Sequence, residues 1–553
     1  MLGRRAAGVE GGEAMTWGRQ TGTATAQGYA TVEATQGCLS RRQFLYTACT
    51  VASAASVGLW PGASAGQAPT VSKATPELVV AFSLDPGHLD PRAEAGVPGS
   101  SMMYPHMYET LVWRRKGTTP DPALGLAESW EQMTPTTLRF RLRQGLKFHN
   151  GDDCDAEAIQ VSAASYAAPE SRSSLKSSLA VVREVKVVDT YTVDYITAVP
   201  NRPLLRALSS QTTLSPRALQ ELGPKIATNP VGTGPYKFVE YVPGQHLLME
   251  VNPNYWGPKP KSQRLKIRFL PENGTRVAAL ESGEVMLITN VPPDTIKRLQ
   301  SNPQLEMRTA VTNRIMLVNL RTDRPPWNDT RARQALNYAI DKEAITEGIL
   351  GGLAPIARAP LAPALLGSHT GLQPYPYDPE KAKKLLAAAG ASGATFHLGV
   401  PYGRYLLDKQ IGEAIAGYLS DIGLQVIFDN PVWSAFVTEI AKYDKARYDG
   451  YFYGWGVTTG EPDTQMREHY HSKFSRRSAY KNPEVDRLVD EAAESFDEAK
   501  VKAAYLKAQE IVWEECPWIF LHMQPDLNAV NKRLQGFEAR LDEWLILTAA
   551  ALV

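Results

Sequence analysis

The sequence contains little cysteine, which excludes a disulfide-stapled framework. Only 4 of the 553 residues are cysteine, and Cys38 and Cys49 lie within the first 65 residues. Cys154 and Cys516 would remain after removal of an export signal, and nothing in their spacing proposes a bridge, although an oxidising compartment would permit one. Their neighbourhoods are structural in character, so we expect two buried free thiols.

An excess of charge of either sign is also missing. Lys and Arg total 59 and Asp and Glu total 58, whereas a nucleic-acid-binding domain needs a basic face. The chain is 43% hydrophobic and 21% charged, which are ordinary values for a folded soluble protein. The length suffices for a large core and roughly three or four structural domains. The composition therefore excludes general nucleic-acid binding and indicates a globular protein of several parts.

Two motifs typical of metalloenzymes and redox proteins do not occur. The sequence has no His-Glu-x-x-His and no Cys-x-x-Cys, the spacings that bind zinc or form redox pairs. His469 and His471 flank Tyr470 in a polar segment, and such a pair could share a metal only on a strand or loop. Since no third ligand is indicated, we expect both histidines on the solvated surface, no resident metal and no cofactor.

The first 65 residues carry an export pattern. Arg41 and Arg42 precede an uncharged run over residues 44–60. Residues 61–62 (PG) end this run, and residues 63–65 (ASA) supply the small residues that a signal peptidase needs. The pattern resembles a twin-arginine signal, which exports folded proteins. We therefore expect these 65 residues to act as a signal peptide and to be removed.

Three alternatives remain open at this terminus. A permanent membrane anchor would need about 20 apolar residues, and the run here is mostly Ala, Ser, Thr and Gly, which favours a cleaved signal. Lipid attachment at Cys49 is another option, although Tyr46 occupies the position where a lipobox has leucine. Translation could also start at Met15 instead of Met1.

Strand and helix patterns alternate along the rest of the chain. Residues 138–142 (LRFRL) alternate apolar and basic, which predicts a half-buried strand, and residues 185–195 predict a hairpin. Asp378 and Asn482 each precede a proline, the combination of N-cap and first residue that begins a helix. The strongest helical pattern runs over residues 331–350 to a following glycine. Such alternation predicts an α/β protein with more than one sheet.

Two short clusters predict turns. In residues 232–235 (GTGP) two glycines can supply positive φ and the proline fixes the exit; a phosphate-binding loop would need a Gly-Lys-Ser/Thr ending and a helix behind it. Residues 148–151 (FHNG) predict a second turn, in which His149 is structural. Tyr255 and Trp256 could be core or interface aromatics.

Four separated segments carry patterns that are weak singly and strong together. They are residues 126–151 (from LAESW to LRFRLRQGLKFHNG), 229–256 (from NPVGTGPYKF to NPNYW), 331–342 (RARQALNYAIDK) and 480–486 (YKNPEVD). Because it has all four segments in this order, the chain resembles the family 5 extracellular solute-binding proteins. That family includes the dipeptide-, oligopeptide- and nickel-binding subunits of ABC importers.

The resemblance implies a bilobal α/β fold, the type II periplasmic-binding-protein class, in which a hinge encloses the solute between two lobes. It also implies three regions with defined boundaries. These are a discontinuous lobe I from residues 77–117, 232–310 and 516–553, an inserted region II from 118–231, and a lobe III from 311–515.

The implied function is capture of a peptide-like or other small polar or carboxylate solute outside the cytoplasmic membrane. The implied partners are that solute and the membrane permease, with its cytoplasmic ATPase subunits. We expect a monomer, free in the periplasm or associated with the transporter, and no enzymatic activity. The alternative from another class is an exported hydrolase with an unrecognised active site. A sensory form of the fold would carry a DNA-binding helix-turn-helix where this chain has an export signal.

The resemblance places ligand-binding residues after two strands of the second lobe. Arg404 falls where dipeptide-binding members carry an arginine that holds the ligand carboxylate, a task suited to its planar fork. The alternative is an ordinary surface arginine before a helix. Trp455 matches the family's cleft tryptophan, and with Tyr453 it is our candidate for a pocket wall, although alternate aromatics on a strand more often fill a core.

At one position the sequence departs from the peptide-binding pattern. Peptide-binding members have an aspartate three residues after this tryptophan, where it pairs with the ligand ammonium, and this chain has Thr458. A buried ammonium without a carboxylate is costly. Glu461 and Asp463 lie nearby but fit the family's turn after the pocket. We therefore expect a small carboxylate-bearing or polar solute, and a peptide remains the alternative.

Overall fold

The computed structural model describes residues 77–92, 98–115, 119–121, 124–169, 171–173, 175–457 and 459–553. The predicted signal peptide and Thr458 lie outside them. The described residues belong to one compact unit, residues 71–553. None of the helices formed by these residues has the length and apolar character needed to cross a membrane.

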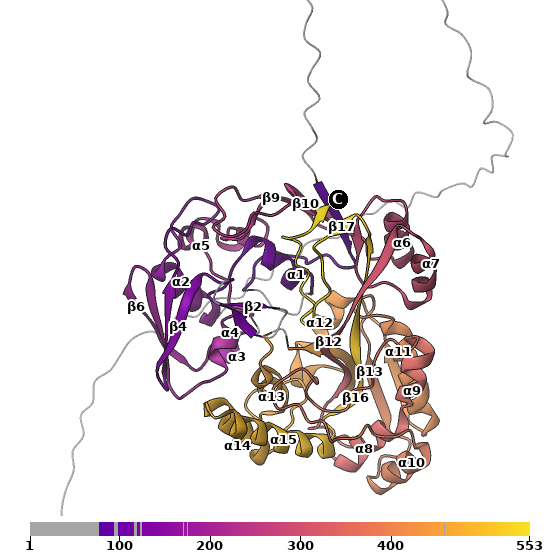
Figure 1. The fold of residues 1–553 in the computed structure, drawn as a ribbon. Helices are drawn as coiled ribbons and strands as arrows, with labels where there is room; N and C mark the ends of the chain where they lie inside the picture. The colour runs from indigo at the N-terminus through magenta and orange to yellow at the C-terminus, as the bar shows by residue number, and fades with distance from the viewer. Residues whose placement is uncertain are drawn as a thin grey trace, which may run out of the picture. The chain divides into compact units, whose positions relative to one another are not determined.

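A ten-stranded mixed sheet is the frame of this unit (Figure 1). Two long strands at its centre, β12 (Leu305–Leu320) and β16 (Trp518–Asn531), pair antiparallel over most of their length. In spatial order the sheet comprises β14 (Gln425–Asp429), β13 (Thr395–Gly399), β15 (Gly450–Gly456), β12, β16, β11 (Leu287–Ile288), β1 (Glu77–Phe82), β10 (Arg264–Phe269), β9 (His246–Val251) and β8 (Tyr236–Val242).

The central pairing is interrupted near its middle. Val311 is the last residue of one regular stretch, opposite Pro525, and pairing resumes with Ile315 opposite Met523. Such an irregularity bends the strand locally and redirects side chains. Strands β11, β1, β10, β9 and β8 continue the sheet from one half of this ladder, and β15, β13 and β14 continue it from the other.

Smaller sheets accompany the large one, as the prediction of more than one sheet requires. In the four-stranded antiparallel sheet, Leu138, Phe140 and Leu142 are buried, which confirms the predicted half-buried strand, and the predicted hairpin is formed. This sheet contains β4 (Ala127–Thr134), β5 (Thr137–Leu142), β7 (Thr192–Thr197) and β6 (Val182–Asp189); two-stranded pairs join β2 (Trp113–Arg115) to β3 (Thr119–Asp121) and β17 (Leu534–Gln535) to β18 (Ala551–Leu552).

Helices connect the strands, and several pack on one another, including α14 on α15 and α8 on α10 (Figure 1). The α-helices are α1 (Pro98–Met107), α2 (Ala156–Ala167), α3 (Leu175–Leu179), α4 (Leu204–Ala207), α5 (Pro216–Leu222), α6 (Asn273–Glu281), α7 (Ile296–Ser301), α8 (Thr330–Ala339), α9 (Lys342–Ala344), α10 (Pro379–Ala388), α11 (Asp408–Asp421), α12 (Trp433–Ile440), α13 (Pro462–Tyr470), α14 (Pro483–Glu494) and α15 (Glu498–Glu515).

The two predicted N-caps are confirmed, but the long helix predicted from residue 331 is wrong. The Asp378 carboxylate accepts from the N–H of Lys381, and the Asn482 side chain accepts from the start of α14. Helix α8 ends at Ala339, because the next residue is extended and Asp341 caps a new short helix. An aspartate that bonds the backbone ahead of it competes with helix continuation.

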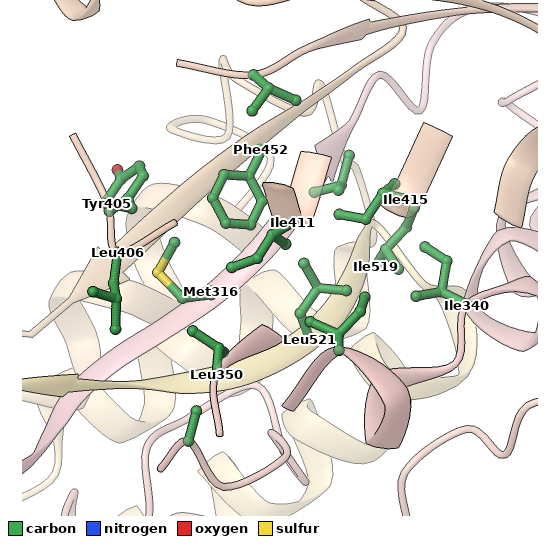
Figure 2. Packing of buried hydrophobic residues seen from close by; sticks show 14 of the residues in the cluster. Met316, Ile340, Leu350, Tyr405, Leu406, Ile411, Ile415, Phe452, Ile519 and Leu521 are labelled. Atoms are coloured by element: carbon green, nitrogen blue, oxygen red, sulfur yellow. The ribbon is translucent and has the colours of Figure 1, made fainter. Parts of the chain in front are cut away.

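The largest apolar core packs against one face of β15 and leaves the side chains of the other face to a different cluster. Phe452 of β15 packs with Ile411 of α11 and Ile519 of β16 in one buried cluster (Figure 2). Each fully buried side chain of this kind contributes about 1.5–3 kcal/mol. Because side chains alternate along a strand, Tyr453 and Trp455 lie on the opposite face, in a different cluster.

The turn at residues 232–235 is formed, but its glycines serve another purpose than predicted. Neither Gly232 nor Gly234 has positive φ. A Cβ on Gly232 would lie 2.1 Å from the Met107 carbonyl oxygen, and one on Gly234 would lie 2.6 Å from the Met107 carbonyl carbon. These glycines are required because two stretches of backbone approach closely.

Two further structural predictions, for the cysteines and for His149, are confirmed. Cys154 and Cys516 are buried free thiols. His149 is tied to the turn at Gly232 and Gly234, with a ring nitrogen 3.0 Å from the Gly234 carbonyl oxygen, and burial lowers its pKa to about 4. This histidine is neutral at neutral pH and acts as part of the fold.

Candidate ligand-binding site

Arg404 lies in the loop between β13 and α11, and one carboxylate holds this loop. Asp408, the first residue of α11, accepts from the backbone N–H groups of Arg404 at 2.8 Å, Tyr405 at 3.0 Å and Gly403 at 3.3 Å. Gly403 and Leu407 have φ of 77° and 51°, a conformation that glycine adopts freely and leucine does not. The loop is therefore shaped by specific bonds and presents Arg404 in one position.

The Arg404 side chain is buried, which excludes the surface alternative. It is 5% exposed, and its Cζ lies 4.3 Å from the Tyr405 ring centroid and 5.5 Å from that of Trp433. The Nε atom has no hydrogen-bond partner, and burial lowers the pKa of the guanidinium. Aromatic faces stabilise a buried cation only in part. Without a carboxylate beside it, its burial costs folding free energy unless an anion binds there.

Aromatic rings continue from Arg404 along one face of β15. Trp433, from the start of α12, stacks near Tyr453 with ring centroids 6.2 Å apart, and Tyr453 stacks near Trp455 at 6.3 Å. Tyr453 is 7% exposed and packs in the core cluster. Trp455 is only partly buried, and its Nε1 has no hydrogen-bond partner. The buried Nε1 of Trp455 is thus a donor that could bind an acceptor on a ligand.

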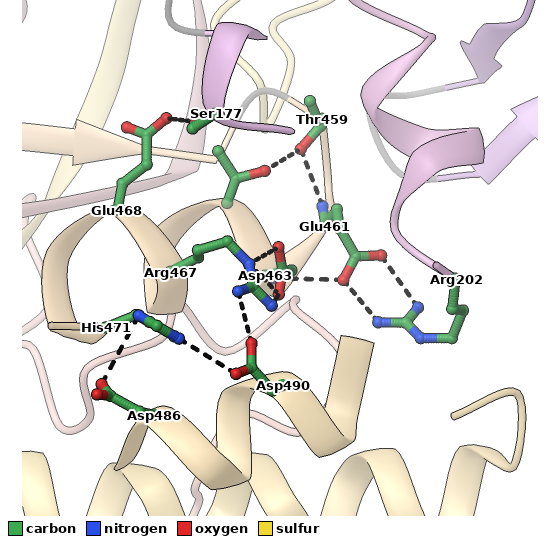
Figure 3. Close-up of polar contacts among 11 residues, drawn as sticks. Ser177, Arg202, Thr459, Glu461, Asp463, Arg467, Glu468, His471, Asp486 and Asp490 are labelled. Atoms are coloured by element: carbon green, nitrogen blue, oxygen red, sulfur yellow. Dashed lines mark hydrogen bonds and ion pairs between the residues drawn. The ribbon is translucent and has the colours of Figure 1, made fainter. Parts of the chain in front are cut away.

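The two histidines expected on the surface are buried, so that prediction is wrong. The His469 ring centroid lies 4.3 Å from that of Trp455 and 4.9 Å from that of Trp518, and burial holds its pKa well below the usual value. His471 contacts Asp486 and Asp490 (Figure 3). Helix α13 turns one histidine into the aromatic core and leaves the other at its end, beside α14. No group of three or more His, Cys, Asp or Glu side chains in the described parts of the chain is arranged so that it could hold a metal ion.

Glu461 and Asp463, the two acidic residues that follow β15, are both engaged in ion pairs (Figure 3). Glu461 is paired with Arg202 through bonds of 2.7 and 3.0 Å, and Asp463 is paired with Arg467 at 3.0 Å. Neither carboxylate is therefore available as an unpaired partner for a ligand ammonium. Thr458 itself lies outside the described residues.

Another ion pair joins β12, near Arg404, to the C-terminal segment. Arg314 of β12 donates to Glu543 at 2.8 and 2.7 Å and to the Gly454 carbonyl at 2.7 Å. Arg314 holds the pKa of Glu543 below its usual value against the effect of burial. Glu543 is thereby neutralised by Arg314, although it also attracts Arg404 electrostatically.

Of the residues predicted from sequence, Arg404, Tyr453 and Trp455 fall in one contiguous group through Tyr405 and Trp433. Sequence reasoning missed Trp433, Arg314 and Glu543. The spacing of these three from the other members is so wide that only the folded chain brings them together. An arginine in a strand, such as Arg314, carries no local signal that distinguishes a buried ion pair from a solvated charge.

Comparisons with known proteins agree on one family. The model of the bacterial extracellular solute-binding proteins, family 5 Middle, matches residues 121–476, more than half of the chain. The glutathione-binding protein GsiB of Pectobacterium atrosepticum is 29% identical over 425 residues, which are 74% of this chain and 82% of that protein. GsiB of Escherichia coli K12 is 26% identical over 412 residues, covering 72% and 80%.

Solved structures share the fold. The periplasmic binding protein DppA of Helicobacter pylori, in complex with the peptide STSA, superposes with a TM-score of 0.79 at 24% identity, over 86% of this chain and 98% of that one. The binding protein AgaA of A. tumefaciens R10, in complex with agropinic acid, gives a TM-score of 0.79 at 23% identity, over 86% and 99%. The expected type II bilobal class is thereby confirmed.

Proposed function

Because the chain belongs to the bacterial extracellular solute-binding proteins of family 5, we propose that it captures a small carboxylate-bearing solute for an ABC importer. It is the substrate-binding subunit, and it delivers the solute to the membrane permease. The related proteins named above bind glutathione, the peptide STSA and agropinic acid, and each of these ligands carries a carboxyl group.

The burial of Arg404 carries this proposal. Arg404 is 5% exposed, and its guanidinium lies against the rings of Tyr405 and Trp433 and has an Nε without a partner. A ligand carboxylate would supply the missing acceptor in the planar geometry that guanidinium favours. Trp455, with an unpartnered Nε1, and Tyr453 form the neighbouring wall, and Thr458 follows Trp455 by three positions in the sequence.

The same residues disfavour a ligand with a free ammonium group at this end of the site. Thr458 replaces the aspartate of the peptide-binding pattern, and the carboxylates of Glu461 and Asp463 are engaged by arginines. An ammonium buried there would lack a partner of opposite charge. We propose that recognition is dominated by the carboxylate and that ordinary peptides are not the preferred solutes.

Replacement of Arg404 tests the proposal. Arg404→Ala should lower the affinity for the solute that co-purifies from the native host about 10- to 100-fold, because one charge-assisted interaction is lost. Arg447→Ala is the matched control, since Arg447 also lies over a tyrosine ring, 5.2 Å from its centroid, but is largely exposed. Titration calorimetry measures both variants. Unchanged affinity in Arg404→Ala would defeat the carboxylate assignment.

We further propose that the chain binds its solute without altering it. The family consists of binding proteins, and the hydrolase alternative gains no support from the relatives described above. Native mass spectrometry of protein purified from its own host should show one unmodified small molecule per chain. Turnover of a candidate solute, abolished by a single substitution, would contradict this.

The three-region organisation is also a proposal, with lobe I from residues 77–117, 232–310 and 516–553, region II from 118–231 and lobe III from 311–515. The break in pairing between β12 and β16 after Val311 supports a hinge there, because a bulged ladder bends more readily than a regular one. Small-angle scattering should show a smaller radius of gyration when the co-purifying solute is added. An unchanged radius would argue against closure.

The export route belongs to the same proposal. The family is extracellular by description, and the twin arginines at residues 41–42 within a signal over residues 1–65 would direct folded export. Replacing Arg41 and Arg42 with lysine should cause the precursor to accumulate in the cytoplasm, as measured by fractionation and immunoblotting. Normal export of that variant would exclude the twin-arginine route.

A further inference from the structure

A second buried arginine lies apart from Arg404 on the short strand β2. Arg114 is 2% exposed, and its Nε and Nη1 atoms have no hydrogen-bond partner. Its Cζ lies 5.1 Å from the Trp544 ring centroid, and the Trp544 ring packs against Trp113 with centroids 5.1 Å apart. The guanidinium is thus covered by aromatic surface but has donors left over.

Other buried arginines show what a structural role looks like in this protein. Arg276 is 0% exposed and donates to the carbonyl oxygens of Leu270 and Thr289, among others. Arg333 is 4% exposed and donates to the carbonyl oxygens of Trp327 and Glu515. Both guanidiniums bind main-chain oxygens and so hold the fold together. Arg114 does not follow this pattern, which argues against a purely structural role.

The carboxylate that acts on Arg114 is engaged elsewhere. Asp542 is bound by Arg540 at 2.8 and 2.9 Å, and its neighbour in the chain, Glu543, is bound by Arg314. Asp542 attracts Arg114 electrostatically without a hydrogen bond to it. Burial lowers the pKa of Arg114 to about 10, so the side chain remains charged at neutral pH.

Further unpartnered donors gather at the same segment, residues 540–544. The Trp544 Nε1 and the Asn313 Nδ2 are buried without partners, and the Asn313 backbone N–H donates to the Leu541 carbonyl at 2.8 Å. Together with Arg114 they form a set of N–H groups that lack acceptors. Buried donors are normally satisfied, and an anionic oxygen ligand would satisfy several of these at once.

The segment also connects Arg114 to the site of Arg404. Glu543, which attracts Arg404, stands between Asp542 and Trp544, which face Arg114. The Cα atoms of residues 542 and 544 are at most about 7 Å apart. Asp542 and Trp544 act on Arg114 and Glu543 acts on Arg404, so one short stretch of chain lies beside both unsatisfied guanidiniums.

We propose that Arg114, with the Trp544 indole, forms a second anion-binding subsite, and that the solute carries two carboxylate groups, one held at Arg404 and the other at Arg114. The inference rests on the proposed function, because it extends the same site. It narrows the solute class from carboxylates in general to small dicarboxylates.

Calorimetric titration of the full chain with dicarboxylates and their monoamides tests the proposal. The probes are succinate, glutarate, adipate and pimelate, each beside its monoamide. Wild-type protein should bind at least one dicarboxylate about tenfold or more tightly than the monoamide. Arg114→Met should abolish this preference and leave monoamide affinity unchanged, whereas Arg404→Met should weaken both probes. Arg217→Met, at an exposed arginine, is the control.

The possible failures are distinguishable. If Arg114→Met leaves the preference intact, or no dicarboxylate binds wild type, the second subsite is refuted. If Arg404→Met leaves every affinity unchanged, the proposed function fails instead. Thermal unfolding without added probe gives an independent readout. Removing an unpaired buried charge should keep or raise Tm in Arg114→Met, whereas Arg276→Met should lower it. A loss of Tm in Arg114→Met equal to that in Arg276→Met would make Arg114 structural and overturn the inference.

Discussion

Burial raises the pKa of three acidic side chains, Glu109, Glu468 and Asp526, to about 7. Glu109 is 5% exposed and accepts from the Tyr255 hydroxyl and the Trp256 Nε1, each at 3.0 Å. These bonds favour the carboxylate and offset part of the effect of burial. The aromatic pair that the sequence left open as core or interface is therefore bonded to a buried carboxyl group.

Glu109 should make the protein less stable as the pH rises. Its folded-state pKa of about 7 lies above its ordinary value, so its stabilising contribution is complete at acidic pH and is lost as the pH rises through 7. From pH 5 to pH 8 the wild type should lose about 2 kcal/mol more unfolding free energy than Glu109→Gln. Chemical denaturation at both pH values measures this, with the exposed Glu128→Gln as control. Identical pH profiles for the wild type and Glu109→Gln would contradict it.

At the scale of elements, the loop between β13 and α11 is the most constrained part of the site. Asp408 accepts four backbone N–H groups, from residues 403, 404, 405 and 409. Its position at the start of a helix also places negative charge near the positive end of the helix dipole. The geometry of Arg404 thus depends on Asp408, which binds the backbone of this loop.

Removal of this carboxylate should affect stability and binding together. Asp408→Ala should lower the unfolding free energy by about 2–3 kcal/mol, because several backbone donors lose their acceptor. Solute affinity should fall as well, since Arg404 would no longer be held in place. Asp408→Asn keeps one acceptor oxygen and should give intermediate values. Unfolding titrations and calorimetry provide both numbers, and a stable Asp408→Ala variant with full affinity would refute the role.

At the scale of the whole molecule, the pair of Arg202 and Glu461 connects distant parts of the chain (Figure 3). Arg202 lies in the proposed region II and Glu461 at the start of α13, in the proposed lobe III. The Glu461 side chain is 1% exposed. Such a buried carboxylate depends strongly on its cationic partners, which here are Arg202 at 2.7 Å and Arg206 at 3.6 Å.

Removing one partner of this pair should lower the free energy of unfolding more than removing both. Arg202→Met should lower the unfolding free energy by about 3 kcal/mol, since the buried Glu461 keeps only the longer contact to Arg206. The double variant Arg202→Met/Glu461→Gln should recover part of that loss, because the buried negative charge is then removed as well. A double-mutant cycle by chemical denaturation measures the coupling. A double variant whose loss of stability equals the sum of the losses in Arg202→Met and Glu461→Gln would show that the pair is not coupled.

Much of the architecture could be predicted locally. The alternation at residues 138–142 and the caps at Asp378 and Asn482 specify a strand and two helices, because each depends on neighbours in sequence. The prediction of one long helix from residue 331 was wrong for a local reason too. It followed the apolar periodicity across Asp341 and gave too little weight to the tendency of that aspartate to cap a new helix. The prediction that the two histidines lie on the surface was wrong for a different reason. The polar sequence around them contains no sign of the aromatic core that α13 faces.

The sequence by itself determined the α/β class, the family and the position of Arg404 after a strand, since these follow from periodicity and from motifs that are contiguous in the chain. Only the tertiary structure decided that Arg404 is buried with an unpartnered nitrogen, that Arg314 and Glu543 are paired beside it, and that Arg114 is unsatisfied as well. Burial and the competition among charges depend on groups more than a hundred residues apart, and no local pattern contains that information.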